Sequence, residues 1–250
     1  MWLNNVERCE KMKKRPLIFQ LYIAGLLGFI ILFSVLNGII YFGLQCRRQR
    51  PKNIEEFRNM EISQTFAHSF FEGMEGWKRD VAKTALGEEY FSMYETVLDG
   101  IACFPVAEKD KCSFDNSWLA ERTYGGKRQH EGCDIMSNVN ERGLFQIVSV
   151  SDGVVEQMGW LDKGGYRVGI RSDAGAYFYY AHLYDYAKGL QIGKKVEAGE
   201  ILGTMGDSGY GKEGTVGKFP VHLHFGIYLN IDGEEKSVNP YWILRYIKNK

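Results

Sequence analysis

Net charge is the first thing that this sequence lacks. Its 250 residues include 31 lysines and arginines against 31 aspartates and glutamates, so no overall field attracts the chain to nucleic acid. Internal repeats and low-complexity segments are also missing, and 45% hydrophobic with 25% charged residues is the composition of a folded protein. We therefore expect no nucleic acid partner, and other partners have to be inferred from local features.

Closely spaced cysteine pairs are absent as well. The five cysteines form no Cys-x-x-Cys motif, which excludes a zinc-finger pattern. If the C-terminal part lies outside the cytoplasm, Cys103 and Cys112 could close a small loop by a disulfide. Two protected free thiols are an equal alternative, and both stay open.

One long segment contains no charge. Residues 17 to 44, LIFQLYIAGLLGFIILFSVLNGIIYFGL, are apolar except for Gln20, Ser34 and Asn37. As a helix these residues would extend about 42 Å, against a hydrocarbon core of about 30 Å. So long an apolar stretch has few places to be buried in a chain of this size. We expect it to span a membrane.

The alternative for this segment is a cleaved secretory signal. Its apolar region exceeds the usual 7 to 15 residues and no small-x-small site follows, which favours a retained signal anchor. Basic residues flank both ends, so the charge bias barely decides the orientation. Because long domains translocate largely regardless of their charge, we place the short N-terminus inside and the rest outside.

The region after the apolar segment shows a helical periodicity of its apolar residues. Apolar residues recur every three or four positions in two sets, and these are Phe66, Phe70, Met74, Trp77 and Val81, then, after Gly87, Tyr90, Phe91, Tyr94, Val97 and Leu98. We interpret them as two helices of a stalk that folds against the following domain. A protein partner docked on the stalk, or a stalk that restricts access to a groove, is the alternative.

From residue 104 onward the residue pattern is typical of β-structure, because short runs of aromatic and β-branched residues alternate with glycine-containing turns. Residues 145–158 are interpreted as two strands joined at Asp152-Gly153, and residues 164–183 as two more joined at 172–175. Short strands follow in residues 190–206, and 221–229 form a further strand. The sequence therefore predicts four segments: a cytoplasmic N-terminus, 1–16; a transmembrane signal-anchor helix, 17–44; a helical stalk, 45–100; and a small, mainly antiparallel β-domain, 101–250.

A glycine-rich loop precedes the last of these strands. GDSGYGK, residues 206–212, has the glycine and lysine spacing of a P-loop, but the next residue is Glu213 where Ser or Thr would hold magnesium. A carboxylate there would oppose phosphate. We interpret the loop as a connection between strands.

Histidines follow this loop at a two-residue spacing. In a strand, residues two apart point to the same face, so His222 and His224 would project together. By itself this pair is equally typical of a polar edge strand. Further partners are present in HEGCD, with His130 and Asp134, and in YYAHL, with His182. Two histidines and one carboxylate meet the requirement of a hydrolytic zinc site, and two histidines remain for proton transfer.

HEGCD, YYAHL and HLHFGIY, in this order and with the GDSGYG loop before the last, resemble the lysostaphin/LytM-type zinc metallopeptidases. The resemblance covers roughly residues 104 to 245. It implies a small antiparallel β-sheet with a groove over one Zn²⁺ per chain, held by His130, Asp134 and His224. It implies His182 and His222 as the catalytic histidines.

The activity implied by the resemblance is hydrolysis of peptide bonds of bacterial peptidoglycan, by a zinc-activated water with two assisting histidines. With the apolar helix, it places the domain outside a bacterial cell membrane, anchored by a single pass. A membrane-anchored, non-catalytic scaffold or activator of cell-wall remodelling is the alternative. Cys133, within the first motif, is interpreted as a buried small apolar residue rather than an extra ligand.

Overall fold

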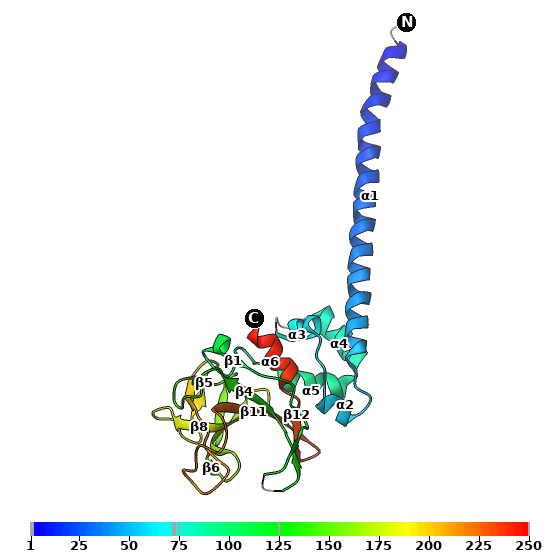
Figure 1. The fold of residues 1–250 in the computed structure, drawn as a ribbon. Helices are drawn as coiled ribbons and strands as arrows, with labels where there is room; N and C mark the ends of the chain where they lie inside the picture. Colours follow the sequence, from blue (N-terminus) through cyan, green and yellow to red (C-terminus); the bar gives the residue numbers. More distant parts are fainter. Residues whose placement is uncertain (1–2, 72–73, 75, 125, 250) are drawn as a thin grey trace.

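The computed structural model describes residues 3–71, 74, 76–124 and 126–249. A single long helix, α1 (Leu3–Arg48), projects from the folded part of the chain like a rod (Figure 1). Its segment Leu17–Arg48 is long and apolar enough to cross a membrane, and an apolar stretch of 18 residues within it is not buried by the rest of the chain. Its length and composition fit the predicted anchor, although the helix continues beyond residue 44 to Arg48.

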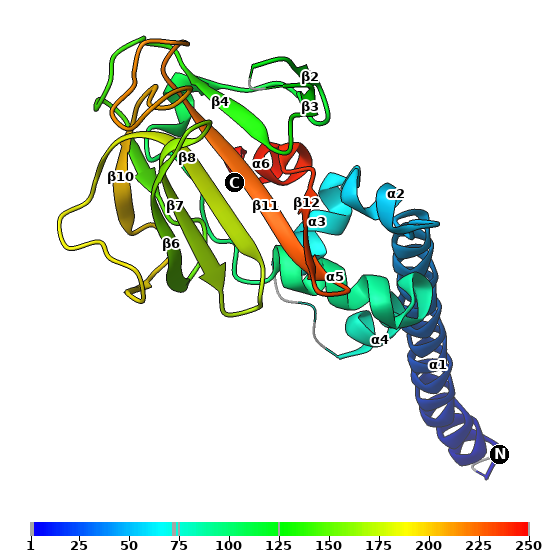
Figure 2. The same cartoon turned by 90° about the horizontal axis from the view of Figure 1, so that it is seen from below.

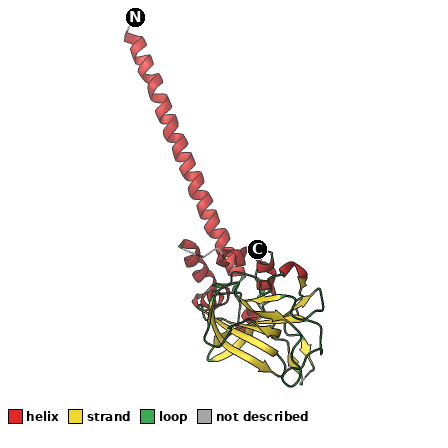
Figure 3. Cartoon of the chain, turned by 90° about the vertical axis from the view of Figure 1, so that its left-hand side faces the viewer, coloured by secondary structure: helices red, strands yellow, loops and turns green. Residues whose placement is uncertain are grey.

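Four short helices follow α1 and pack together beside the base of the rod (Figures 1 and 3). These are α2 (Ile54–Arg58), α3 (Gln64–Phe71), α4 (Trp77–Leu86) and α5 (Glu88–Leu98). The second predicted helix corresponds to α5. The first was wrong as one continuous helix, because α3 ends at Phe71 and Gly76, at φ 57°, precedes the start of α4. A positive φ is incompatible with a continuing right-handed helix.

The remaining residues form the β-domain seen in Figure 2. Its strands are β1 (Cys112–Ser113), β2 (Glu121–Arg122), β3 (Arg128–Gln129), β4 (Cys133–Ser137), β5 (Gln146–Val148), β6 (Gly153–Leu161), β7 (Gly165–Ser172), β8 (Tyr177–Tyr186), β9 (Lys195–Val196), β10 (Ile201–Met205), β11 (His222–Ile231) and β12 (Glu234–Val238). A 3₁₀ turn, Lys109–Lys111, precedes β1, and α6 (Tyr241–Lys248) ends the described chain.

All the strand pairs of this domain are antiparallel, as predicted. The main sheet runs β1-β4-β11-β8-β7-β6-β9, with β12 beside β11 and β10 joining β8 to β5, while β2 and β3 form a separate hairpin. The mainly β fold expected from the sequence is thus confirmed. The neighbouring strands β4, β11 and β8 carry four of the five residues of the candidate site, Asp134, His182, His222 and His224.

Individual strand predictions succeeded where the pairing is local. β7 and β8 form the predicted hairpin through residues 172–175. The residues around Asp152-Gly153 do join β5 to β6, as predicted, but these two strands do not pair with each other: β5 pairs with β10, whereas β6 pairs with β7 and β9. A turn sequence reverses the chain without determining which strand its arms join.

The cysteines of the predicted loop are free thiols. The Cys103 thiol donates to the Ser149 carbonyl at 3.2 Å and the Cys112 thiol to the Glu108 carbonyl at 3.8 Å. Burial raises the pKa of Cys112 to about 11. The structure thus has the second of the two alternatives, protected thiols, at these positions.

Docking of the helical segment on the β-domain depends on α2 and the end of β12. Arg58 Nε donates to the Ser237 carbonyl at 2.8 Å and Nη2 to the Ser237 hydroxyl at 3.0 Å. In return, the amide of Asn239 donates to the Arg58 carbonyl at 2.7 Å. Apolar side chains of the helices and of the sheet belong to one continuous core. The stalk is therefore packed against the β-domain.

Replacing Arg58 with alanine is expected to lower the free energy of unfolding by about 1.5–3 kcal/mol, the usual contribution of hydrogen bonds from a charged group. The guanidinium is largely buried, and its loss leaves Ser237, 1% exposed, without these donors. Thermal unfolding of the detergent-solubilised chain checks this. Lys78→Ala, on the exposed face of α4, is the control; equal melting temperatures for both variants would contradict the docking role.

Candidate metal and catalytic site

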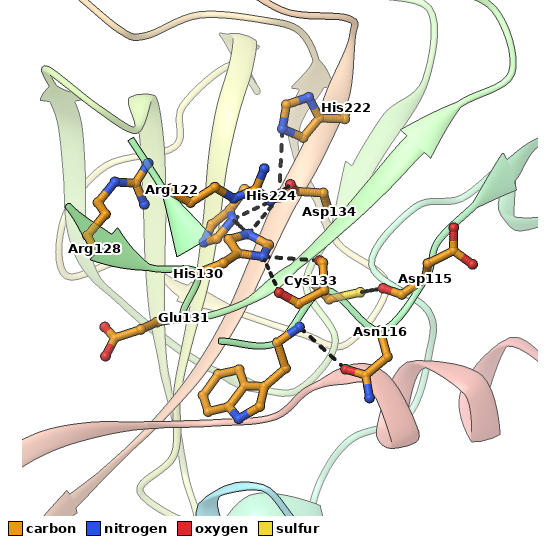
Figure 4. Close-up of polar contacts among 12 residues, drawn as sticks. Asp115, Asn116, Arg122, Arg128, His130, Glu131, Cys133, Asp134, His222 and His224 are labelled. Atoms are coloured by element: carbon orange, nitrogen blue, oxygen red, sulfur yellow. Dashed lines mark hydrogen bonds and ion pairs between the residues drawn. The ribbon is translucent and has the colours of Figure 1, made fainter. Parts of the chain in front are cut away.

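Strand register brings the predicted site residues together. On β11, His224 lies opposite Asp134 of β4 on one side and opposite Ala181 of β8 on the other. His222 is two residues before His224, so both project to the face that Asp134 also occupies. His130 lies just before β4. Figure 4 shows three of these side chains, His130, Asp134 and His224, converging on one point.

Three potential ligand atoms form a compact cluster. His130 Nε2 is 3.0 Å from Asp134 Oδ1 and 2.9 Å from His224 Nδ1, and His224 Nδ1 is 3.0 Å from Asp134 Oδ1. Ligands of a tetrahedral zinc at its usual bond lengths are separated by about 3.3 Å. Two imidazole nitrogens and one carboxylate oxygen are also the donors that zinc prefers. The cluster therefore fits a zinc ion in both chemistry and size.

Gly132 makes room for the cluster. A Cβ atom at this position would lie 2.6 Å from His224 Cε1 and 2.7 Å from the Phe225 carbonyl. Any side chain would therefore displace the His224 ring or the backbone of β11. The glycine of HEGCD is required by this close approach of His224 rather than by a turn.

Backbone carbonyls decide which nitrogen of three histidines carries the proton. Nδ1 lies 3.1 Å from the Ser117 carbonyl in His130, 2.7 Å from the Ser208 carbonyl in His182, and 2.7 Å from the Pro220 carbonyl in His222. A carbonyl only accepts, so each Nδ1 carries the hydrogen and each Nε2 keeps a free lone pair. His130 Nε2 is thereby ready to bind a metal, and His182 and His222 are ready to accept a proton. The sequence carries no signal for these three carbonyls.

Burial favours the neutral form of His182, His222 and His224 by lowering the pKa of each. It lowers the pKa of His182, as do the neighbouring His222 and His224, and burial is also the main cause of the lowered pKa of His222. For Asp134, burial alone would raise the pKa, but hydrogen bonds to His130 and His224 hold it below its ordinary range. The site thus combines an ionised carboxylate with neutral histidines, the protonation states that metal ligands and general bases require.

A cavity of about 260 Å³ opens over the cluster. Its walls are formed by Arg122, Arg128, His130, Asp134, Lys163, Gly164, Tyr179, His182, Tyr210, Phe219, His222 and His224. All five predicted site residues are among them. The stalk helices lie outside this set, so the structure gives no support to a stalk that blocks the groove.

Tyrosines and polar residues near these motifs differ in their surroundings. Tyr179 and Tyr210 line the cavity, whereas Tyr180 is fully buried in the core. Asn116 hydrogen-bonds Asn239 and the Trp118 amide, away from the cluster. Cys133, 1% exposed, points its thiol at the Asp115 carbonyl, as expected for a small buried residue (Figure 4).

Three cationic residues of the cavity were not anticipated from the sequence. Arg122 Nη2 donates to Asp134 Oδ2 at 2.6 Å, which leaves Oδ1 facing the two histidines. Arg128 and Lys163 are the other two. The only available sequence signal was the position of both arginines within eight residues before His130.

The metal-free chain is expected to lose stability as the pH falls below about 6.5. Unfolded histidines take up protons near this pH, whereas His182 and His222 stay neutral because their folded pKa is lower. The unfolded state then binds more protons, so stability rises with pH. Unfolding at pH 5.5 and 7.5 in chelator measures the effect, and His182→Gln should reduce the slope. Equal stability at the two pH values would contradict the neutral assignment.

Comparison with known proteins assigns the chain to a family. Residues 128–240 match the model of peptidase family M23. A structure of a LytM protein from Ruminococcus gnavus is 38% identical and superimposes with a TM-score of 0.69, covering 83% of this chain and 96% of that one. The chain belongs to peptidase family M23.

Curated M23 relatives match over a shorter range. An L-Ala–D-Glu endopeptidase of Bacillus subtilis is 39% identical over 171 residues, which is 68% of this chain and 51% of the relative. Lysostaphin of Staphylococcus simulans is 27% identical over 113 residues, 44% of this chain and 20% of that protein. The chain thus spans about half the length of the Bacillus subtilis relative and 20% of the length of lysostaphin.

Proposed function

We propose that this M23 protein is a zinc-dependent endopeptidase that hydrolyses peptide bonds of bacterial cell-wall peptidoglycan. The observation that carries the proposal is the convergence of three donor atoms, one each from His130, Asp134 and His224, beneath a cavity that also contains two neutral histidines. The curated relative of Bacillus subtilis is named as an endopeptidase, which agrees with a hydrolytic role for this cluster.

In this proposal His130 Nε2, Asp134 Oδ1 and His224 Nδ1 would hold the metal. Zinc, when bound, lowers the pKa of a water ligand toward about 7 and polarises a carbonyl. Arg122 keeps the carboxylate oriented, because it holds Oδ2 on the side away from the histidines. The ligand set is thus preorganised by contacts that already exist in the chain.

The two remaining histidines would move protons during hydrolysis. His222 Nε2 lies 3.7 Å from Asp134 Oδ1, and the ring centres of His182 and His222 are 4.8 Å apart. With Nδ1–H bound to a backbone carbonyl in each, the free Nε2 can take a proton from a nucleophile and return it to the leaving amine. Once protonated, either ring can stabilise the negative charge that develops on the scissile carbonyl.

Zinc content and hydrolysis test the proposal together. The purified full chain is expected to contain one zinc and to release peptides from isolated peptidoglycan, and chelation should stop the release until zinc is restored. Zinc without hydrolysis of any wall type would reject the peptidase and favour the non-catalytic scaffold. A chain that binds no zinc would reject the site assignment itself.

We also propose that the chain is anchored in a bacterial cell membrane by its apolar helix, residues 17–44, with residues 1–16 in the cytoplasm. The stalk, residues 45–100, and the peptidase domain, residues 101–250, then face the cell wall. The exposed apolar surface of α1 supports the anchor. Protease added to intact spheroplasts should digest the β-domain; protection until the membrane is lysed would reverse the orientation.

A further inference from the structure

Arg128 has an incompletely satisfied guanidinium at the wall of the site cavity. Its Nη2 donates to the Tyr210 hydroxyl at 3.1 Å, but its Nε is buried without a hydrogen-bond partner. Among the described residues no carboxylate forms an ion pair with it. Because Arg128 is part of the cavity wall and no described carboxylate balances its charge, an anion that enters the cavity can pair with the guanidinium.

The register of the β2–β3 hairpin places a second positive charge beside Arg128. Arg122 and Arg128 lie directly opposite each other. Like charges at such positions destabilise a strand pair. Asp134 neutralises Arg122, but Arg128 has no equivalent acid within the described chain. Figure 4 shows both arginines on the same side of the histidine cluster.

Lys163 contributes a third positive charge to the same cavity. It lies in the turn between β6 and β7 and is exposed. The carbonyl of the next residue, Gly164, accepts a hydrogen bond from the backbone amide of His182 at 2.8 Å. This bond fixes the turn beside His182, one of the two candidate catalytic histidines. The cavity wall therefore contains Arg122, Arg128 and Lys163 against one carboxylate, Asp134.

We propose that Arg128 and Lys163 bind a carboxylate of the substrate peptide that flanks the scissile bond. This inference deepens the proposed function and rests on it for the position of the scissile bond. A guanidinium fork binds a carboxylate through two parallel hydrogen bonds, and a nearby ammonium adds charge. The site is then selective for acidic peptides and poor for chains of neutral residues such as oligoglycine.

Two matched peptides test this selectivity. They differ only in a free carboxylate or its carboxamide beside the scissile amide. The full chain in detergent should bind the carboxylate peptide roughly 10- to 150-fold more tightly, the range of a charge-assisted hydrogen bond converted to affinity. Binding is measured in chelator as well, so that contact of the carboxylate with a metal cannot produce the preference.

Arg128→Gln should remove the preference by weakening only the carboxylate peptide. Zinc content should not change, because Arg128 touches none of the three clustered donors. Lys163→Gln should reduce the preference less, since its side chain is exposed. Lys127→Gln is the matched control: Lys127 lies on the same hairpin, pairs with Glu121 at 3.7 Å, and is not part of the cavity wall.

Equal affinity of the wild-type chain for the two peptides would overturn the anion site, and so would an Arg128→Gln variant that weakens both peptides equally. These results are independent of the proposed activity. A chain that cleaves both peptides alike keeps the peptidase and loses the carboxylate site. A chain that prefers the carboxylate peptide but cleaves neither keeps the carboxylate site and loses the peptidase.

Discussion

Replacing Asp134 with alanine is expected to abolish stoichiometric zinc binding and peptide hydrolysis together. Asp134 Oδ1 lies 3.0 Å from both His130 Nε2 and His224 Nδ1, and it supplies the negative charge in the cluster. Losing an outer-shell partner of a metal site already costs about 10- to 100-fold in affinity. Loss of a ligand should exceed this. Elemental analysis after dialysis and release of peptides from peptidoglycan measure the two losses.

Asp115→Ala is the control for this substitution, because Asp115 is a nearby exposed acid whose contact with the site runs through its backbone carbonyl. It should keep both zinc and activity. An Asp134→Ala variant with a full zinc content would show that the metal, if needed, is held elsewhere. Arg122 would also lose its partner in this variant, so the melting temperature of the metal-free chain has to be compared as well.

Replacing His222 with alanine is expected to leave zinc bound and to slow hydrolysis by about 10²- to 10⁴-fold, the usual contribution of a positioned acid or base. His222 Nε2 is farther from Asp134, at 3.7 Å, than either clustered histidine nitrogen. Its Nδ1 is bound to the Pro220 carbonyl. His182→Ala should behave similarly, because its Nδ1 is bound to the Ser208 carbonyl. Zinc analysis and kcat for peptide release separate binding from chemistry.

His68→Ala serves as the control among the histidines. His68 contacts the Tyr246 hydroxyl through Nδ1 at 3.0 Å, outside the cavity, so this variant should hydrolyse at the wild-type rate. Loss of zinc from His222→Ala in a folded chain would instead make His222 a ligand. Unchanged hydrolysis would remove it from the mechanism altogether.

Motifs predicted the composition of the candidate site better than its internal geometry. Alternation in a strand placed His222 and His224 on one face without knowledge of any partner strand. The reason for the glycine in HEGCD was not accessible in this way, because it depends on the His224 ring, which lies against Gly132 from another strand. The positive charge of the cavity was missed for the same reason: Arg128 and Lys163 meet only through the fold.

The sequence by itself determined the features that depend on near neighbours in the chain. These are the uncharged helix that fits a membrane, the antiparallel β-domain, the β7–β8 hairpin and the five residues of the family motifs. The tertiary structure alone decided the partners of β5 and β6, the proton positions of His130 and His182, and the lack of a described carboxylate that pairs with Arg128. Each of these depends on contacts between residues far apart in sequence, such as His182 with the Ser208 carbonyl. Local pattern cannot encode such contacts, since many long-range pairings satisfy the same alternation of polar and apolar residues.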